Sequence, residues 1–239
     1  MSRPMQALQQ PERIRRMFAG IARRYDFLNH FLSANRDRGW RRATVEAGGA
    51  RPGDAVLDVC TGTGDLALEW ARALGRGSRV VGTDFCEPMV RLGREKAARE
   101  SLPVRLSVAD TLRLPFRDGR FQVASVGFGI RNVSDLKAGI AEMARVVRPG
   151  GRVVVLEFTR PANALLRFVY YVYFLLLLPL LGNLVSGSRE NAYGYLPRSV
   201  LSFPDRHRLR RVMEEAGLRE VRVRDLSLGI VTVHVGVKP

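Results

Sequence analysis

The sequence predicts an α/β fold built on a central, mainly parallel β-sheet. Between residues 55 and 158, short apolar stretches typical of strands alternate with longer segments of helical periodicity. The first of these strands, Ala55–Val59, leads into a Gly-x-Gly turn, and an apolar helical pattern begins at Leu66. Two further strand-like segments end the chain, which favours an antiparallel addition to the sheet.

The segment before the first strand is basic and has the periodicity of a helix. Apolar side chains recur every three or four positions at Phe18, Ile21, Tyr25, Leu28 and Leu32. Such a stripe can pack on the sheet, and its position ahead of the first strand also allows it to cover a ligand. We therefore predict a helical N-terminal cap over residues 1–49.

The later elements continue the alternation. Helices are expected to begin near residue 66 and to cover residues 89–100, 135–147 and 205–216, and strands are expected at 80–84, 104–108, 123–127 and 153–158. The Pro-Gly-Gly run at 149–151 is interpreted as the turn before the last of these strands. In the final strand, four valines at alternate positions face one way, while Thr232 and His234 face the other.

Residues 168–181 form a run of fourteen positions without a charged side chain. A helix that spans a bilayer needs about 20 apolar residues, and Pro179 removes a backbone donor near the end of the run. We therefore do not expect a transmembrane helix. An apolar insertion over residues 161–203 is predicted instead, which builds a pocket or an interfacial contact. Simple core packing stays open as the alternative.

Length and composition favour a single domain over residues 1–239. The net charge is +16, and only three of the 39 basic residues are lysines. Such a charge favours an anionic partner, either nucleic acid or a membrane surface, although an arginine bias without function explains it equally well. Cys60 and Cys86 lack metal-ligand spacing, and the N-terminus has no secretory signal, so we expect no metal and a cytoplasmic location.

The turn after the first strand predicts the cofactor. Gly62 and Gly64 let a ligand approach the backbone or let the chain adopt a positive φ. Asp84 ends the next strand, where an acid can bind ribose hydroxyls. Asp58 would repel a pyrophosphate but attract the cationic amino group of a methionine moiety. Together they predict S-adenosylmethionine (SAM) rather than a dinucleotide, and an ordinary β-α turn with capping carboxylates is the alternative.

Polar side chains also follow the third and fourth strands, at the edge where open α/β sheets hold their ligands. Asp110 could accept a hydrogen bond from an adenine amino group, or it could cap the turn that follows. Residues 128–132, which end in Arg131 and Asn132, are predicted to form a flexible lip where the reacting groups lie.

Several longer motifs resemble the C-methyltransferases of quinone biosynthesis, more closely the demethylmenaquinone methyltransferases and their ubiquinone-pathway relatives. The motifs are Leu-Asp-Val-Cys-Thr-Gly-Thr-Gly-Asp at 57–65, Leu-Pro-Phe at 114–116, Gly-Phe-Gly-Ile-Arg-Asn-Val at 127–133, Arg-Pro-Gly-Gly at 148–151, Leu-Glu-Phe at 156–158, Phe-x-x-Ile-Ala-x-x-Tyr-Asp at 18–26 and the ending at 229–234. The resemblance covers nearly the whole chain. One departure from the commoner methyltransferase pattern is Cys60 in place of glycine.

The resemblance implies a class I, Rossmann-like methyltransferase: a mainly parallel seven-stranded sheet with an antiparallel C-terminal strand and an apolar helical insertion after the fifth strand. The cofactor contacts that it implies are Thr63, Asp84, Asp110 and Thr111, and Phe85 and Gly127 complete the candidate set. The expected reaction moves a methyl group from SAM to a ring carbon of a demethylated polyprenyl quinol, demethylmenaquinol to menaquinol. The alternatives are a SAM-dependent RNA methyltransferase and a membrane-peripheral binding protein that retains only the fold.

Methyl transfer to carbon needs a ring made electron-rich by loss of a hydroxyl proton. We expect Arg131 to favour that anion as a fixed positive charge and Asn132 to orient it, with a structural salt bridge as the alternative for Arg131. The candidate proton acceptors are Tyr25, Tyr193 and His234, of which histidine alone titrates near neutrality. The expected partners are the polyprenylated quinol and the anionic inner face of the cell membrane, without nucleic acid, and a homodimer is left open.

Overall fold

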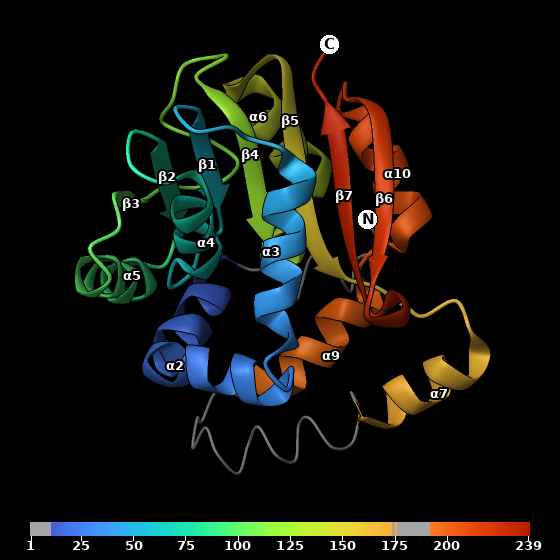
Figure 1. The fold of residues 1–239 in the computed structure, drawn as a ribbon. Coiled ribbons are helices and arrows are strands. Elements are labelled where there is room, and N and C mark those ends of the chain that lie inside the picture. The colour runs from blue at the N-terminus through green and yellow to red at the C-terminus, as the bar shows by residue number, and fades with distance from the viewer. Residues whose placement is uncertain (1–10, 174, 176–191) are drawn as a thin grey trace.

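The computed structural model describes residues 11–173, 175 and 192–239. Its centre is a seven-stranded sheet of order β3-β2-β1-β4-β5-β7-β6 (Figure 1). The strands are β1 Ala55–Val59, β2 Arg79–Asp84, β3 Val104–Val108, β4 Phe121–Gly127, β5 Val147–Phe158, β6 Arg219–Leu226 and β7 Val231–Val237. The first five strands are parallel, and β7 runs antiparallel to both of its neighbours. The predicted mixed sheet is therefore confirmed.

Helices cover both faces of the sheet because its apolar side chains alternate between them. Leu57 and Val126 pack with α6 (Leu136–Val146) and α10 (Arg206–Glu215) on one face. Val56 and Val154 pack on the other face with α3 (Arg36–Gly48) and α4 (Asp65–Leu74), and α5 (Glu87–Arg99) joins this layer beside β3. No helix of the described residues combines the length and the apolar character needed to cross a membrane.

A third group of helices lies beyond the carboxyl ends of the parallel strands (Figure 1). It consists of α2 (Pro11–Leu32), α7 (Ala164–Val172) and α9 (Ala192–Ser202). Ile14, Ile21 and Leu28 of α2 pack with Tyr170 of α7 and Tyr195 of α9, and these side chains form a separate apolar cluster. The segment predicted as an N-terminal cap thus has two parts, since α3 lies on the sheet while α2 crosses the ligand edge.

The largest difference from the predicted element boundaries is at β5. β5 begins at Val147 rather than at residue 153, because Val147 pairs with Phe121 before the chain turns through Gly150, whose φ is +74°. The apolar run at 168–181 is described only in part. Its first five residues belong to α7, and positions 174 and 176–181 lie outside the described residues.

Candidate functional site

A cavity of about 540 Å³ lies between the carboxyl edge of the sheet and the helices α2, α7 and α9. Its inner wall comes from the turns after β1, β2, β3 and β4, and its outer wall is largely aromatic. The predicted site residues that line it are Tyr25, Asp58, Gly62, Thr63, Asp84, Phe85, Asp110, Thr111, Gly127, Arg131 and Asn132. Gly64 and His234 do not line it.

The glycine turn after β1 has the conformation expected from its sequence. Gly62 has φ +57° and Gly64 has φ +86°, in the region that disfavours side chains. A Cβ on Gly62 would meet only the Tyr25 ring, at 3.9 Å, so it would extend into the cavity. A Cβ on Gly64 would lie 3.3 Å from Leu106 instead. Gly62 therefore leaves room for a ligand, whereas the side of Gly64 that a Cβ would occupy faces Leu106 behind the turn, and Gly64 does not line the cavity.

Asp84 is a buried acid at the end of β2 that also braces the glycine turn. Its Oδ2 accepts a hydrogen bond from the Gly62 backbone at 2.8 Å, and its Oδ1 accepts one from the Cys86 backbone at 2.9 Å. Burial raises the pKa of Asp84, and these backbone donors oppose the increase. Each carboxylate oxygen keeps acceptor capacity, so the side chain is a fixed acceptor on the cavity wall.

Asp58 lies beneath the same turn and is nearly inaccessible to solvent. Its two oxygens accept hydrogen bonds from the hydroxyls of Thr61 at 2.6 Å and Ser125 at 2.9 Å. Burial raises the pKa of Asp58 to about 7, although the two hydroxyls favour the charged form. Asp58 can therefore gain or lose a proton near neutrality, which its place in the sequence did not indicate.

Asp110 and Thr111 stand side by side but have different surroundings. Asp110 is exposed, and its Oδ1 accepts a hydrogen bond from the Leu112 backbone at 2.9 Å, as a turn cap does. Thr111 is buried, and its Oγ1 lies 3.3 Å from the Cys60 sulfur. Burial raises the pKa of the Cys60 thiol, which stays neutral. The capping alternative for Asp110 is thus realised, and one carboxylate oxygen remains for a ligand.

Phe85 and Gly127 border the cavity without polar side-chain atoms. Phe85 follows Asp84 and packs against the apolar cluster of α2, α7 and α9. A Cβ on Gly127 would lie 3.2 Å from Leu66, a close contact that explains the glycine at the end of β4. Both residues shape the wall rather than donate or accept through a side chain.

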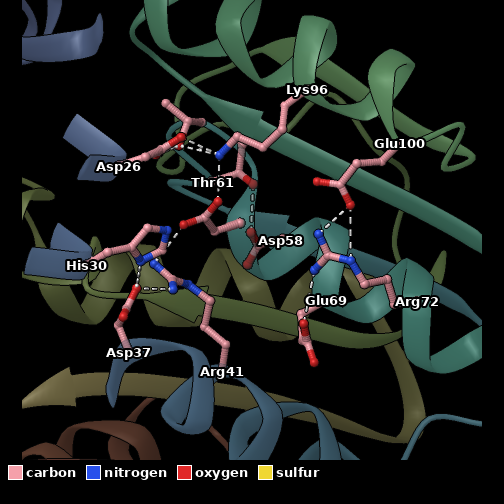
Figure 2. A network of polar contacts seen from close by, with 12 residues as sticks. Asp26, His30, Asp37, Arg41, Asp58, Thr61, Glu69, Arg72, Lys96 and Glu100 are labelled. Atoms are coloured by element: carbon pink, nitrogen blue, oxygen red, sulfur yellow. Dashed lines mark hydrogen bonds and ion pairs between the residues drawn. The ribbon is translucent and has the colours of Figure 1, made fainter. Parts of the chain in front are cut away.

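A network of charged side chains fastens α2 over the glycine turn (Figure 2). The Lys96 ammonium from α5 lies 2.5 Å from a carboxylate oxygen of Asp26 and 2.5 Å from one of Asp65. The Thr63 hydroxyl donates to Asp26 at 2.5 Å. Thr63 therefore joins the turn to the cap, and its hydroxyl is already engaged there.

The network continues through Arg41 of α3. Arg41 contacts Asp65 at 3.0 Å and Asp37 at 2.5 Å, and His30 Nδ1 lies 2.6 Å from the same Asp37 carboxylate. Burial opposes ionisation of Asp37, but Arg41, Ser33 and His30 together outweigh it, so the pKa of Asp37 is lowered. His30, Asp37 and Asp65 come close enough together to bind a cation, but Arg41 already provides the positive charge for both carboxylates.

The outer half of the cavity is walled by aromatic rings. The rings of Trp40 and Phe128 have centroids 5.8 Å apart, and those of Phe128 and Phe158 are 4.6 Å apart. Tyr25, Tyr170 and Tyr195 complete this wall from α2, α7 and α9. Flat apolar walls with a few hydroxyls suit a planar ring that carries polar groups.

Arg131 enters this half of the cavity with a buried partner. Its Nη1 lies 2.8 Å from Oε1 of Glu157, and it also donates to the Phe128 carbonyl. Both side chains are buried. Burial raises the pKa of Glu157, and the adjacent guanidinium opposes that shift. The salt bridge considered as an alternative for Arg131 is present. Glu157 stands in the Leu-Glu-Phe motif, but sequence analysis gave it no role.

Two further polar groups lie beside Arg131. Asn132 accepts a hydrogen bond from the Tyr195 hydroxyl at 2.8 Å, which leaves the Asn132 amide hydrogens for other acceptors. Tyr25 stands half-buried above the glycine turn, and its burial raises its pKa despite the nearby positive charge of Arg131. At neutral pH, Tyr25 is therefore a hydrogen-bond donor rather than a proton acceptor.

His234 lies away from the cavity, on the face of β7 that α10 covers. It is fully buried, and its Nε2 lies 3.0 Å from the carbonyl oxygen of Arg206. Burial lowers the pKa of His234 to about 4, so it is neutral at physiological pH. We therefore assign it no role in proton transfer, contrary to the expectation from sequence. Tyr193, the other candidate, has a side chain outside the described part of the chain.

Comparison with known proteins identifies the family. The ubiE/COQ5 methyltransferase family matches residues 5–238. The chain belongs to this family. It is 46% identical over 229 residues to the ubiquinone/menaquinone biosynthesis C-methyltransferase UbiE of Geobacter sulfurreducens, covering 95% of this chain and 89% of that protein. It is 45% identical to the demethylmenaquinone methyltransferase of Thermus thermophilus, covering 93% of this chain and 100% of that one.

The fold itself recurs among more distant methyltransferases. A SAM-dependent methyltransferase from Thermotoga maritima, described as a possible histamine N-methyltransferase, superposes with a TM-score of 0.66 at 18% identity, covering 93% of this chain and 100% of that one. One from Aquifex aeolicus gives a TM-score of 0.62 at 18% identity, covering 83% and 89%. The predicted class I fold and SAM-dependent C-methyltransferase activity are thus confirmed, and the comparisons give no support to an RNA methyltransferase.

Proposed function

We propose that this enzyme transfers the methyl group of SAM to a ring carbon of a demethylated polyprenyl quinol, converting demethylmenaquinol to menaquinol. The observation that carries the proposal is a single cavity with two unlike halves. One half presents fixed acids around a glycine turn, and the other presents aromatic rings around Arg131. A nucleoside with a charged amino acid part suits the first half, and an apolar ring with hydroxyls suits the second.

We assign the inner half to the cofactor, which supplies an electrophilic methyl group when it is bound. Asp84 would accept hydrogen bonds from ribose hydroxyls with the capacity left by its two backbone donors. Asp58 would face the cationic amino group, and Gly62 provides the open space beside the turn. Asp110, Thr111 and Phe85 would surround the base. In this assignment Thr63 and Gly64 hold the turn rather than the ligand.

In the outer half, we propose that Arg131 stabilises the negative charge that develops on a quinol oxygen when its proton leaves. The charge is held in place by Glu157, which acts as a positioning residue because it touches Arg131 and is not on the cavity wall. Asn132, fixed by Tyr195, and Tyr25 would donate hydrogen bonds to the same oxygen. We assign the hydroxyl proton to water, since among the described candidates His234 lies away from the cavity and Tyr25 is neutral. When the new carbon–carbon bond forms, the carbon–sulfur bond of SAM breaks, and the ring-carbon proton that the methyl group replaces also leaves to water as the ring regains its aromaticity.

We further propose a single catalytic domain at the cytoplasmic face of the membrane, where a polyprenylated substrate resides. The positive net charge of +16 favours contact with anionic lipids, and we expect no nucleic-acid partner. A homodimer is the alternative partner for the surface that would contact the membrane.

The direct test is to incubate the purified protein with isotopically labelled SAM and either demethylmenaquinol or a demethylated ubiquinol precursor, followed by mass analysis. One labelled methyl group on the ring carbon of demethylmenaquinol is the expected product. Asp84→Ala is the comparison variant, since its weakened SAM binding should reduce product formation at a limiting SAM concentration. Methylation of neither quinol by the wild-type protein would refute the proposed substrate class.

A further inference from the structure

The outer face of α7 is apolar, although a surface helix normally turns its polar side to water. Leu165, Phe168, Val169 and Val172 follow the spacing of one helical face, and they are 72, 66, 57 and 39% exposed. Tyr170, on the opposite face, is only 5% exposed and packs against α2. The helix therefore shields a small aromatic cluster with one side and presents an uncovered apolar side outward.

The end of α2 extends this exposed apolar area. Phe27 and Phe31 are largely exposed, and their rings stack with centroids 6.0 Å apart. Tyr173, just after α7, donates a hydrogen bond to the Leu32 carbonyl at 2.6 Å, which ties the two helices together. Figure 1 shows both helices on the same side of the molecule, beyond the carboxyl ends of the strands. The outer apolar surface comprises Phe27, Phe31, Leu165, Phe168, Val169, Val172 and Leu175.

Basic side chains continue the same stripe of α2 toward its N-terminus. Arg23 is exposed and lies four residues before Phe27, one helical turn away. Arg16 is also exposed and lies seven residues before Arg23, so these spacings keep all three side chains on one face. Arg13 is also exposed on this side. An apolar area bordered by arginines is the composition of an interfacial membrane-binding surface.

We propose that the outer apolar surface docks on an anionic lipid bilayer, with the arginines of α2 at the headgroups. The inference rests on the proposed function, because a polyprenylated quinol resides in that bilayer. Tyr170 and Tyr173 line the catalytic cavity from the inner side of the same segment. In the docked enzyme, the outer, aromatic half of the cavity therefore lies next to the lipid. The substrate ring can then enter the cavity while the prenyl tail stays in the membrane.

Charge favours a bilayer over a second copy of the chain. In an isologous dimer through this surface, the arginines of α2 would face the same arginines of the second chain or lie beside them. Each chain carries a net charge of +16, so the approach of two such faces is opposed. An anionic leaflet instead attracts each basic side chain of the stripe that comes near its surface.

The experiment measures sedimentation of the purified full-length protein with vesicles of phosphatidylcholine alone and of phosphatidylcholine with phosphatidylglycerol. The test variant is Leu165→Ser with Phe168→Ser. Its matched control is Val108→Ser with Val223→Ser, which removes two exposed apolar side chains from the sheet edges. We expect the wild type and the control to bind the anionic vesicles, and the test variant to bind about tenfold or more weakly. Added salt should weaken wild-type binding.

Two further readouts separate the possible failures. Turnover of a short-chain quinol analogue without vesicles should be unchanged in the test variant, and absence of that turnover in the wild type would refute the proposed function alone. Equal vesicle binding by the test variant and the wild type would overturn the docking proposal, as would failure of the wild type to bind anionic vesicles. A wild-type dimer that the test variant converts to monomer, with vesicle binding unchanged, would instead assign the surface to a second copy.

Discussion

The two halves of the cavity differ in how their polar groups are held. In the inner half, acids are fixed by backbone and hydroxyl donors of the sheet and its turns, as Asp84 is by the Gly62 backbone. Ser125 of β4 does the same for Asp58. In the outer half, polar groups are fixed by other functional side chains. Glu157 of β5 holds Arg131, and Tyr195 of α9 holds Asn132. The inner half is therefore a property of the sheet and the turns at its edge, whereas the outer half is complete only when the helices beyond the sheet are assembled.

This difference has an energetic consequence. Burial of ions is costly unless a partner compensates it, so the outer half combines its catalytic charge with a structural one. Loss of one ion-pair partner in the outer half should therefore lower the free energy of unfolding more than loss of an acid in the inner half that accepts hydrogen bonds from the backbone. Substitutions in the outer half are therefore expected to have the largest effects.

Arg131→Gln should lower the free energy of unfolding by about 3–5 kcal/mol, because Glu157 would remain buried without its counter-ion. Turnover should also fall by a hundredfold or so, the scale of one lost electrostatic contact to a developing charge. Denaturant unfolding and steady-state kinetics measure the two effects. Because an uncompensated Glu157 can take up a proton, the stability loss should be smaller at acidic pH.

A second variant separates the structural role of Arg131 from its catalytic role. Arg131→Gln combined with Glu157→Gln removes both charges, so most of the lost stability should return. Turnover should stay low, since the positive charge is still missing from the cavity. Recovery of turnover together with stability would assign Arg131 to the structural salt bridge only.

Asp84→Ala should weaken SAM binding by about 1.5–3 kcal/mol, the value of a hydrogen bond to a charged group. The turn would also lose the acceptor for the Gly62 and Cys86 backbones, so a smaller loss of stability accompanies it. Calorimetric titration measures the affinity. Asp110→Ala is the comparison, because Asp110 is exposed and caps a turn, and we expect its effect to be smaller. A larger loss of SAM affinity in Asp110→Ala than in Asp84→Ala would show that Asp110 is the more important cofactor contact.

Sequence predicts the inner half well for a physical reason. The strand, the glycine turn and the acid at the next strand end are local features, and parallel strands bring their carboxyl ends to one edge without further information. The placement of Asp58, Gly62 and Asp84 at the carboxyl edge of a mainly parallel sheet follows from that rule, whereas the strand order does not. Spacing alone does not show which of Gly62 and Gly64 leaves room for the ligand and which one the positive φ of the turn requires.

The outer half is harder to predict from sequence because its partners are side chains that no spacing rule pairs, and only the fold brings them into contact. Glu157 appeared in a motif, but only the fold shows that it lies against Arg131. His234 was chosen for its intrinsic pKa, although alternation along the final strand had already placed it opposite the valines. Likewise, the apolar run after β5 predicted burial or an interface. The choice between them needs the exposed fractions along α7.

The raised pKa of Asp58 predicts a pH dependence of SAM binding. A cationic amino group favours charged Asp58, so binding below a pKa of about 7 must release a proton, and the Kd should fall up to about tenfold per pH unit until that value is reached. Asp58→Asn should bind weakly at every pH, without the slope. Titrations between pH 5 and 8 provide the measurement, and a slope retained by the variant would assign it to another group.

The same shift has the opposite sign for folding. The unfolded chain loses the Asp58 proton near pH 4, while the folded chain keeps it until about 7. Between these values the folded state binds more protons, so this residue's contribution to stability falls as the pH rises. As the pH rises, the free energy of unfolding of the wild type should therefore fall relative to that of Asp58→Asn. The affinity of the wild type for SAM should rise over the same pH range.

The smallest expected effect concerns the charged network that joins the two halves. Lys96→Met removes the ammonium between Asp26 and Asp65, although Arg41 still neutralises Asp65. Because these side chains are only partly buried, we expect SAM affinity to fall by about 0.5–1 kcal/mol, through faster opening of α2 over the glycine turn. Hydrogen exchange across residues 11–32 should increase in the same variant.

Lys137→Met is the matched control for this network. Lys137 pairs with Glu215 at 3.4 Å on the exposed surface, away from the cavity. It removes the same charge and a similar side chain, so effects of net charge on SAM binding appear in both variants. If the two variants bind SAM equally and exchange equally in α2, the network does not fasten the cap. If only Lys96→Met loosens α2, the inner half depends on its assembled cover as well as on its local turn.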